Sequence, residues 1–147
     1  MIFLDFTLTG PDPRSHDLVE VALFKYTGLP EECPYLEIII PVDDAVWDID
    51  YLDPEIIKEL RDRPERPNRV YSLDYPELVK EFVGNGPETP VCYCPIELYN
   101  LFEWESMDFG SWYHGATGKM ELPIDFKNRA LDDCFSMVKV YHELQAQ

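Results

Sequence analysis

The first two dozen residues place the strongest constraint on the fold. The apolar run from Ile2 to Leu8 carries one acid, Asp5, and the chain breaks at Gly10 before a second apolar run from Leu18 to Phe24. Prolines lie between the two runs, so they predict neighbouring β-strands joined by a turn. An aspartate among buried apolar residues needs either a hydrogen-bonding partner or a metal ion. Asp5 is therefore the first candidate functional residue.

The rest of the chain alternates further strands with helices. Turn residues and apolar spacing predict strands at 35–40 and 90–94, helices at 53–60, 73–83, 96–104 and 129–145, and a long irregular loop at 107–123. Asn128 is the expected N-cap of the last helix. This order predicts an α/β fold: an antiparallel three-strand meander plus parallel strands, flanked by helices. No fifth strand can be assigned from the pattern.

Length and composition favour one soluble domain spanning residues 1–147. The chain has no apolar run long enough for a membrane span and no basic segment typical of a signal peptide, so we expect a cytoplasmic protein without membrane contact. The pair Cys92 and Cys94 alternates on a strand and fits neither a tight disulfide nor a zinc knuckle, and we expect all four cysteines to be reduced, mostly buried thiols.

The formal net charge of −17 restricts the partners. Such a surface repels the phosphate backbone, because nucleic-acid affinity comes mainly from Lys and Arg that displace counterions. Nucleic acid can still be bound when divalent metal ions bridge carboxylates and phosphates. A basic protein surface is the other partner that this charge suits.

The N-terminal strands resemble the first motif of the DEDD 3′→5′ exonucleases, which share the RNase H-like fold. That motif reads apolar-apolar-Asp-x-Glu-Thr-x-Gly. Asp5 matches the aspartate, Thr9 and Gly10 match the Thr-x-Gly tail, and Val19-Glu20-Val21 matches the following strand. Thr7 stands where the family has glutamate. The resemblance implies an RNase H-like mixed sheet.

The last helix carries a second resemblance. The segment Asn128–Asp133 is similar to the family's His-x-Ala-x-x-Asp pattern, with Ala130 and Asp133 in place and Asn128 at the histidine position. Asparagine caps a helix well but cannot act as a base near neutral pH. Asp132 and Asp133 can equally be first-turn acids that the helix dipole favours.

The middle motif of the family is less defined in this chain. Glu97 fits an Asp-x-x-x-Leu pattern if the upstream turn is shortened, whereas an ungapped placement puts Tyr99 at that position. Glu97 is preferred because it retains a carboxylate. It can also be an exposed acid in the first turn of a helix.

The family resemblance implies a two-metal site, in which carboxylates hold two ions and a base activates water. Asp5 and Asp133 would be metal ligands, Glu97 a substitute, and Mg²⁺ or Mn²⁺ would bind weakly. With Thr7 the chain lacks the family's glutamate carboxylate, and with Asn128 it lacks the family's histidine base. His114 lies in the predicted loop that contains three glycines and is a possible replacement base, although a surface or packing role suits it as well.

These matches lead to three alternatives for function. The leading hypothesis is an exonuclease-fold protein with a depleted metal site, impaired in catalysis and acting through partner binding by its acidic surface. The second is an active 3′→5′ exonuclease on single-stranded DNA or RNA with a variant site of Asp5, Glu97, Asp133 and His114. The third is an acidic decoy of nucleic acid.

Overall fold

The structure is a computed structural model that describes residues 1–12, 14–42, 44–84, 89–93, 95 and 105–147. The strands are β1 (Ile2–Leu8), β2 (Leu18–Lys25), β3 (Tyr35–Ile39), β4 (Arg69–Tyr71), β5 (Val91–Cys92) and β6 (Met107–Asp108). The helices are η1 (Pro30–Glu32), α1 (Pro54–Asp62), α2 (Tyr75–Val83), α4 (Phe109–Thr117) and α5 (Ala130–Gln145). None of the helices in these ranges combines the length and apolar composition that a bilayer crossing needs.

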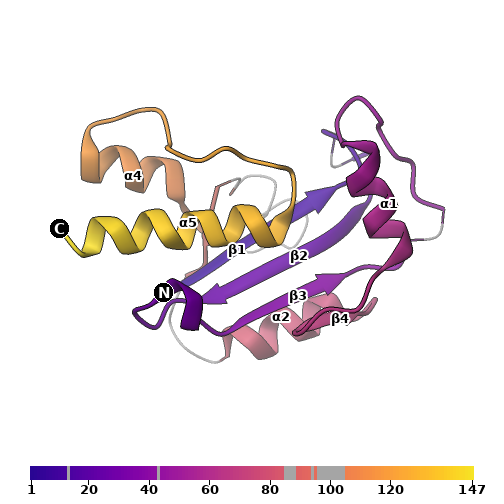
Figure 1. The fold of residues 1–147 in the computed structure, drawn as a ribbon, viewed down its shortest axis with the longest axis horizontal. Coiled ribbons are helices and arrows are strands. Elements are labelled where there is room, and N and C mark those ends of the chain that lie inside the picture. The colour runs from indigo at the N-terminus through magenta and orange to yellow at the C-terminus, as the bar shows by residue number, and fades with distance from the viewer. Residues whose placement is uncertain (13, 43, 85–88, 94, 96–104) are drawn as a thin grey trace.

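The described strands form one mixed sheet in the order β4-β3-β2-β1-β5-β6. Strands β1, β2 and β3 pair antiparallel, whereas β4 joins β3, β5 joins β1 and β6 joins β5 in parallel. The predicted α/β class, with an antiparallel meander, parallel strands and flanking helices, is confirmed (Figure 1). Strands β4 and β6 are parallel strands that the sequence pattern did not reveal.

Alternation along β1 and β2 divides the core between the two faces of the sheet. Phe3 and Phe24 belong to the cluster that α5 covers with Met137. Leu4 belongs to the opposite cluster, which α2 covers with Val79. Successive side chains of a strand point to opposite faces, so a continuous apolar run supplies both layers. Water is excluded from both layers, so a charged group buried in either layer requires a specific partner.

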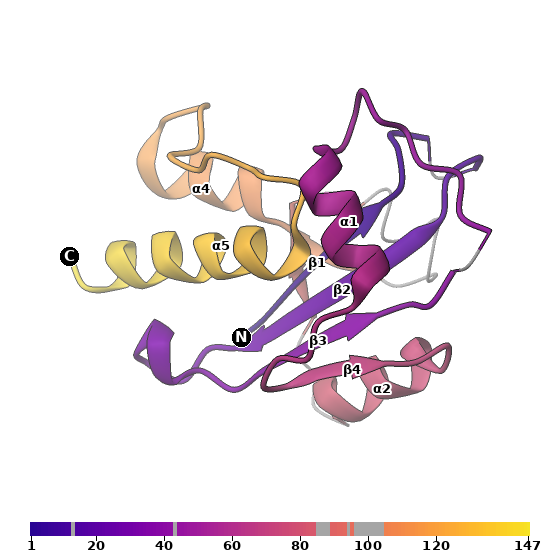
Figure 2. The same cartoon turned by 45° about the vertical axis from the view of Figure 1, so that its right-hand side comes forward.

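Helix α1 begins as predicted. The Asp53 side chain accepts a hydrogen bond from the backbone N–H of Glu55, and Pro54 occupies the first helical position. Leu60 anchors the helix on Val19 and Ile39 of the sheet. Figure 2 shows α1 beside the N-terminal end of α5, which places both helices above the same part of the sheet.

The prediction of an irregular loop at 107–123 is wrong for residues 107–117. Strand β6 and helix α4 occupy these residues, and the Asp108 side chain caps α4 by accepting from the N–H of Gly110. Gly118, with φ 74°, ends the helix in the left-handed region that favours glycine. The glycines that suggested a loop therefore include a helix terminator. The predicted helix at 96–104 lies outside the described residues.

The cysteines of the described part of the chain match the expectation. Cys33, Cys92 and Cys134 are buried and form no disulfide. Burial raises the pKa of the Cys134 thiol, and the Asp5 carboxylate raises it further. A thiol whose pKa is raised stays protonated and is a poor nucleophile or metal ligand. These cysteines therefore act as core residues, and Cys94 lies outside the described residues.

Candidate functional site

Asp5 lies on β1 opposite Ala22 of β2, on the face that α5 covers. Its side chain is partly buried and packed beneath the helix, and this loss of hydration raises the pKa of the carboxyl well above its ordinary value. Neighbouring negative charge from Asp133 and then Glu20 raises the pKa further. Asp5 is thus an acid held in an unfavourable electrostatic environment.

Asp133 reaches the same place from α5, whose N-terminal end packs on β1 and β2 (Figure 1). The residue is 4% exposed, and its Oδ1 accepts a hydrogen bond of 2.8 Å from the backbone N–H of Lys127. Burial raises the pKa of Asp133, while backbone N–H groups of the 127–129 turn oppose that rise. The structure therefore brings together the two acids that the sequence singled out.

Thr7 does not point at an open ligand position. Its hydroxyl lies 2.6 Å from Oε1 of Glu20 and 3.1 Å from the carbonyl oxygen of Asn128, and both atoms are acceptors. Thr7 and Glu20 are directly opposed in the β1–β2 register. A carboxylate is therefore present next to Thr7, but β2 supplies it rather than β1.

The Glu20 carboxylate is fully buried and its Oε1 already has three donors. Besides Thr7, it accepts from the backbone N–H of Ala130 at 2.7 Å and from Nε of Arg129 at 3.3 Å. Oε2 of Glu20 has no hydrogen-bond partner within the described residues. Glu20 thus caps the first turn of α5 from below and leaves one buried oxygen uncommitted.

Arg129 brings a positive charge into the site. The side chain is 9% exposed and reaches Glu20 on β2 and Glu59 on α1, with Nη1 2.7 Å from Oε2 of Glu59. Burial alone would lower the pKa of Arg129, but these two carboxylates raise it, so the guanidinium stays charged. A permanent cation therefore balances acids at the place where the family resemblance expects metal ions.

The expected cap role of Asn128 is wrong. The N-cap of α5 is Arg129, which makes no side-chain cap bond, and the missing acceptor is replaced by Glu20. Asn128 has φ 57°, and its side-chain amide donates to the carbonyl of Tyr51 at 3.4 Å. The side chain at the family's histidine position is therefore bonded to the loop before α1.

The charges continue away from the site as an ion-pair chain. Glu59 also contacts Arg66 and Arg69, and Arg69 pairs with Glu37 of β3. The side chains of Arg69 and Glu37 are each 1% exposed. Desolvation of Arg69 is offset by Glu37, which is the reason its pKa is raised rather than lowered. This series of ion pairs connects helices α5 and α1 with strands β2, β3 and β4 of the sheet.

His114 is not part of this cluster. It is exposed on α4 and lines a separate groove of about 740 Å³ with Asp108, Ser111 and Phe126. Its position on α4, beyond the β5–β6 side of the sheet, gives no contact with Asp5 or Asp133 among the described interactions. Glu97 and Tyr99 lie outside the described residues.

The donor atoms of the described residues do not fit a pair of divalent ions. No group of three or more His, Cys, Asp or Glu residues in the described ranges gathers closely enough to hold a metal ion. Oε1 of Glu20 and Oδ1 of Asp133 accept protein hydrogen bonds, and Arg129 supplies positive charge. Two-ion sites need several carboxylates with open oxygen atoms. Within this cluster, Oε2 of Glu20 is a buried carboxylate oxygen without a hydrogen-bond partner in the described part of the chain.

The sequence interpretation missed Glu20, Glu59 and Arg129 as members of the cluster. Glu20 carried a signal, since it is the one charged residue inside the apolar run from Leu18 to Phe24. A charge at such a position predicts a buried partner. Arg129 and Glu59 lie in polar surroundings in the sequence, and only the packing of α1 beside α5 identifies them.

The chain matches no protein-family model and no curated protein sequence. The site is therefore interpreted from its own geometry and from the resemblance of its motifs.

Proposed function

We propose that this protein is an RNase H-like, exonuclease-type scaffold whose metal site is depleted, so that catalysis is impaired and the protein acts by binding a partner through its acidic surface. The strand arrangement supports the fold: an antiparallel β1–β2–β3 meander is extended beyond β1 by the parallel strands β5 and β6. The convergence of Asp5 and Asp133 beneath α5 supports the kinship.

One observation carries the loss of activity: Arg129 lies against Glu20. A guanidinium at this distance satisfies the carboxylate without a metal ion and repels a divalent cation. Thr7 adds a neutral hydroxyl in place of a carboxylate, and Asn128 is bonded elsewhere. Any Mg²⁺ or Mn²⁺ would therefore bind weakly, as a single ion.

A second candidate function is a variant nuclease site. Its supporting observation is Oε2 of Glu20, a buried carboxylate oxygen without a partner, placed opposite Thr7. Glu20 would then provide the carboxylate that Thr7 lacks, together with Asp5 and Asp133. This candidate predicts metal-dependent shortening of single-stranded DNA or RNA.

A trimming assay separates the two candidates. A 5′-labelled single-stranded oligonucleotide is incubated with the protein and about 5 mM Mg²⁺ or Mn²⁺, a concentration that saturates metal sites of ordinary affinity. The proposal expects no shortening beyond that of the Asp5→Asn variant. Shortening from the 3′ end that Asp5→Asn abolishes and Lys80→Gln retains would establish the variant nuclease instead.

The segment between β3 and α1 supports partner binding. Residues 44–53 contain no Lys or Arg, and among their acids Asp44, Asp50 and Asp53 are exposed. The same segment exposes Val46 to 65% and Ile49 to 72%. Exposed apolar side chains beside like charges are typical of a protein-binding surface. A basic partner with an apolar face would complement both features.

Two synthetic peptides test this surface. One is an amphipathic helix with a lysine face and a leucine face, and the other carries the same charge without leucine. The proposal expects tighter, salt-sensitive binding of the amphipathic peptide, reduced to the level of the other peptide by Val46→Ser with Ile49→Ser. Equal affinity for both peptides, unchanged by these substitutions, would show that the segment is not a docking surface.

A further inference from the structure

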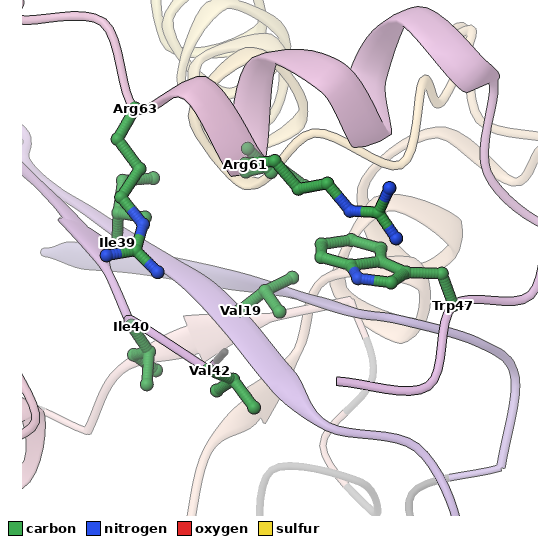
Figure 3. Close-up of a pocket in the computed structure, with 8 residues that line it drawn as sticks. Val19, Ile39, Ile40, Val42, Trp47, Arg61 and Arg63 are labelled. Atoms are coloured by element: carbon green, nitrogen blue, oxygen red, sulfur yellow. The ribbon is translucent and has the colours of Figure 1, made fainter. Parts of the chain in front are cut away.

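A pocket between α1 and strands β2 and β3 is separate from the Asp5 cluster (Figure 3). It has a volume of about 280 Å³ and is lined by side chains of β2, β3, α1 and the segment that precedes α1. Its floor includes Val19, Ile39 and Leu60, each at most 5% exposed. The bottom of the pocket is therefore core surface, which favours an apolar group.

One wall of the pocket is a stacked pair. Cζ of Arg61 lies 5.5 Å from the centroid of the Trp47 ring, and Figure 3 shows the guanidinium above the indole. In the described part of the chain Arg61 makes no ion pair, although the protein has a net charge of −17. Stacking on Trp47 fixes the guanidinium while leaving its N–H donors available at the rim.

Arg63 supplies a second positive charge on the other side. It follows α1 in the left-handed conformation, with φ 50°, and its backbone N–H donates to the carbonyl of Glu59 at 2.9 Å. In Figure 3 its guanidinium lies across the pocket from Trp47, above Ile40. Asp62 is exposed and does not line the pocket. The pocket thus combines an aliphatic floor with two guanidinium groups.

We propose that this pocket binds a carboxylate that carries a branched aliphatic body, either as a free small acid or as the C-terminal apolar residue of a peptide. Guanidinium groups bind carboxylates through paired, charge-assisted hydrogen bonds. The aliphatic body would cover Val19 and Leu60. A nucleobase suits the pocket less, because Arg61 already covers the face of Trp47 that a base would stack on. This inference does not depend on the proposed function.

The test uses 4-methylpentanoate as the ligand and 4-methylpentanamide as its neutral counterpart. Binding is followed by fluorine NMR of protein labelled with fluorotryptophan, and the Trp47→Phe variant assigns the Trp47 signal. The acid is expected to shift the Trp47 signal saturably, with an affinity that falls as salt is raised. The amide is expected to leave the signal unchanged. A shift with both compounds, or with neither, would overturn the proposal.

Charge variants complete the experiment. Arg61→Gln is expected to weaken binding of the acid about tenfold or more, since it removes a charge-assisted hydrogen bond. Lys80→Gln removes the same charge from α2, on the opposite face of the sheet, and is expected to have no effect. Equal weakening by Lys80→Gln would show that binding depends only on the net charge of the protein and would contradict a specific site.

Peptides distinguish the two sources of the carboxylate. A tripeptide ending in leucine is compared with the same tripeptide amidated at its C-terminus. A shift of the Trp47 signal by the acid form alone supports a chain terminus as ligand, whereas a shift by 4-methylpentanoate without the peptide supports a free acid.

Discussion

Arg129 and Glu20 form a buried ion pair, with Nε of Arg129 3.3 Å from Oε1 of Glu20, between the start of α5 and the sheet. The same oxygen accepts from the N–H of Ala130, so one carboxylate both neutralises a cation and caps a helix. This carboxylate oxygen therefore stabilises the docking of α5 and is less available to a metal ion.

The Glu20→Gln substitution is expected to destabilise the protein by about 3–5 kcal/mol, because it leaves the Arg129 charge without one of its partners. Denaturant unfolding measures the change. The matched control is Glu77→Gln, in an exposed pair with Lys80, where the expected cost is at most about 1 kcal/mol. Equal costs for the two variants would contradict the role of Glu20.

The Thr7→Val substitution removes the hydroxyl that donates to Glu20 and keeps nearly the same shape. A hydrogen bond to a charged group contributes about 1.5–3 kcal/mol, and a loss of this size is expected in the free energy of unfolding. Thr7→Ser keeps the hydroxyl and should cost only the buried methyl group, about 1 kcal/mol. Wild-type stability of Thr7→Val would show that the hydroxyl is unimportant.

Asp5 is expected to weaken the fold as it ionises. Its pKa is raised in the folded state, first by burial, so the folded protein binds the proton more tightly than the unfolded chain. Stability from this group is then highest at acidic pH and is lost as pH rises from about 4 through the folded pKa.

Asp5→Asn removes this ionisation and should be more stable than the wild type at pH 7. The difference in unfolding free energy between the variant and the wild type should shrink towards pH 4. The groups that face Asp5 are the same in both proteins, namely Asp133, Glu20 and Cys134. Denaturant curves at several pH values measure it. If the stability of Asp5→Asn relative to the wild type were lower at pH 7 than at pH 4, the pKa of Asp5 would be lowered rather than raised in the folded protein.

Glu59 should show the opposite pH dependence. Hydrogen bonds from Arg129 lower the pKa of Glu59, so its contribution is present above the ordinary value and is lost as pH falls through the folded pKa. Glu59→Gln should therefore cost stability at pH 7 and little at low pH. A double-mutant cycle with Arg129→Gln should give a coupling of about 0.5–3 kcal/mol. Additive effects would show that the two side chains do not interact.

The parts of the fold that were predictable rest on apolar periodicity. The runs of β1 and β2 and the spacing along α5 identified the layers, and Asp53 with Pro54 marked the start of α1. Strand β5 was predicted, whereas β4 and β6 were not, because three and two residues are too few to show a period and their pairing depends on the sheet around them. Helix α4 was missed because glycine is a poor helix former outside a cap.

The candidate site was only half predictable. The positions of Asp5 and Asp133 follow from the strand and helix that carry them. The identity of their partners does not, since Arg129 reaches Glu20 from 109 positions away in the sequence. Ion pairs of this kind depend on packing between elements, which a sequence pattern does not encode.

The central claim is that the acids of this site serve the protein's own hydrogen bonds rather than a pair of metal ions. Calorimetric titration with Mn²⁺, in the wild type and in Asp5→Asn, tests it most directly. The account predicts at most one ion, bound no tighter than about 1 mM (roughly −4 kcal/mol). Two ions bound at submillimolar concentration in the wild type, and lost in Asp5→Asn, would contradict it.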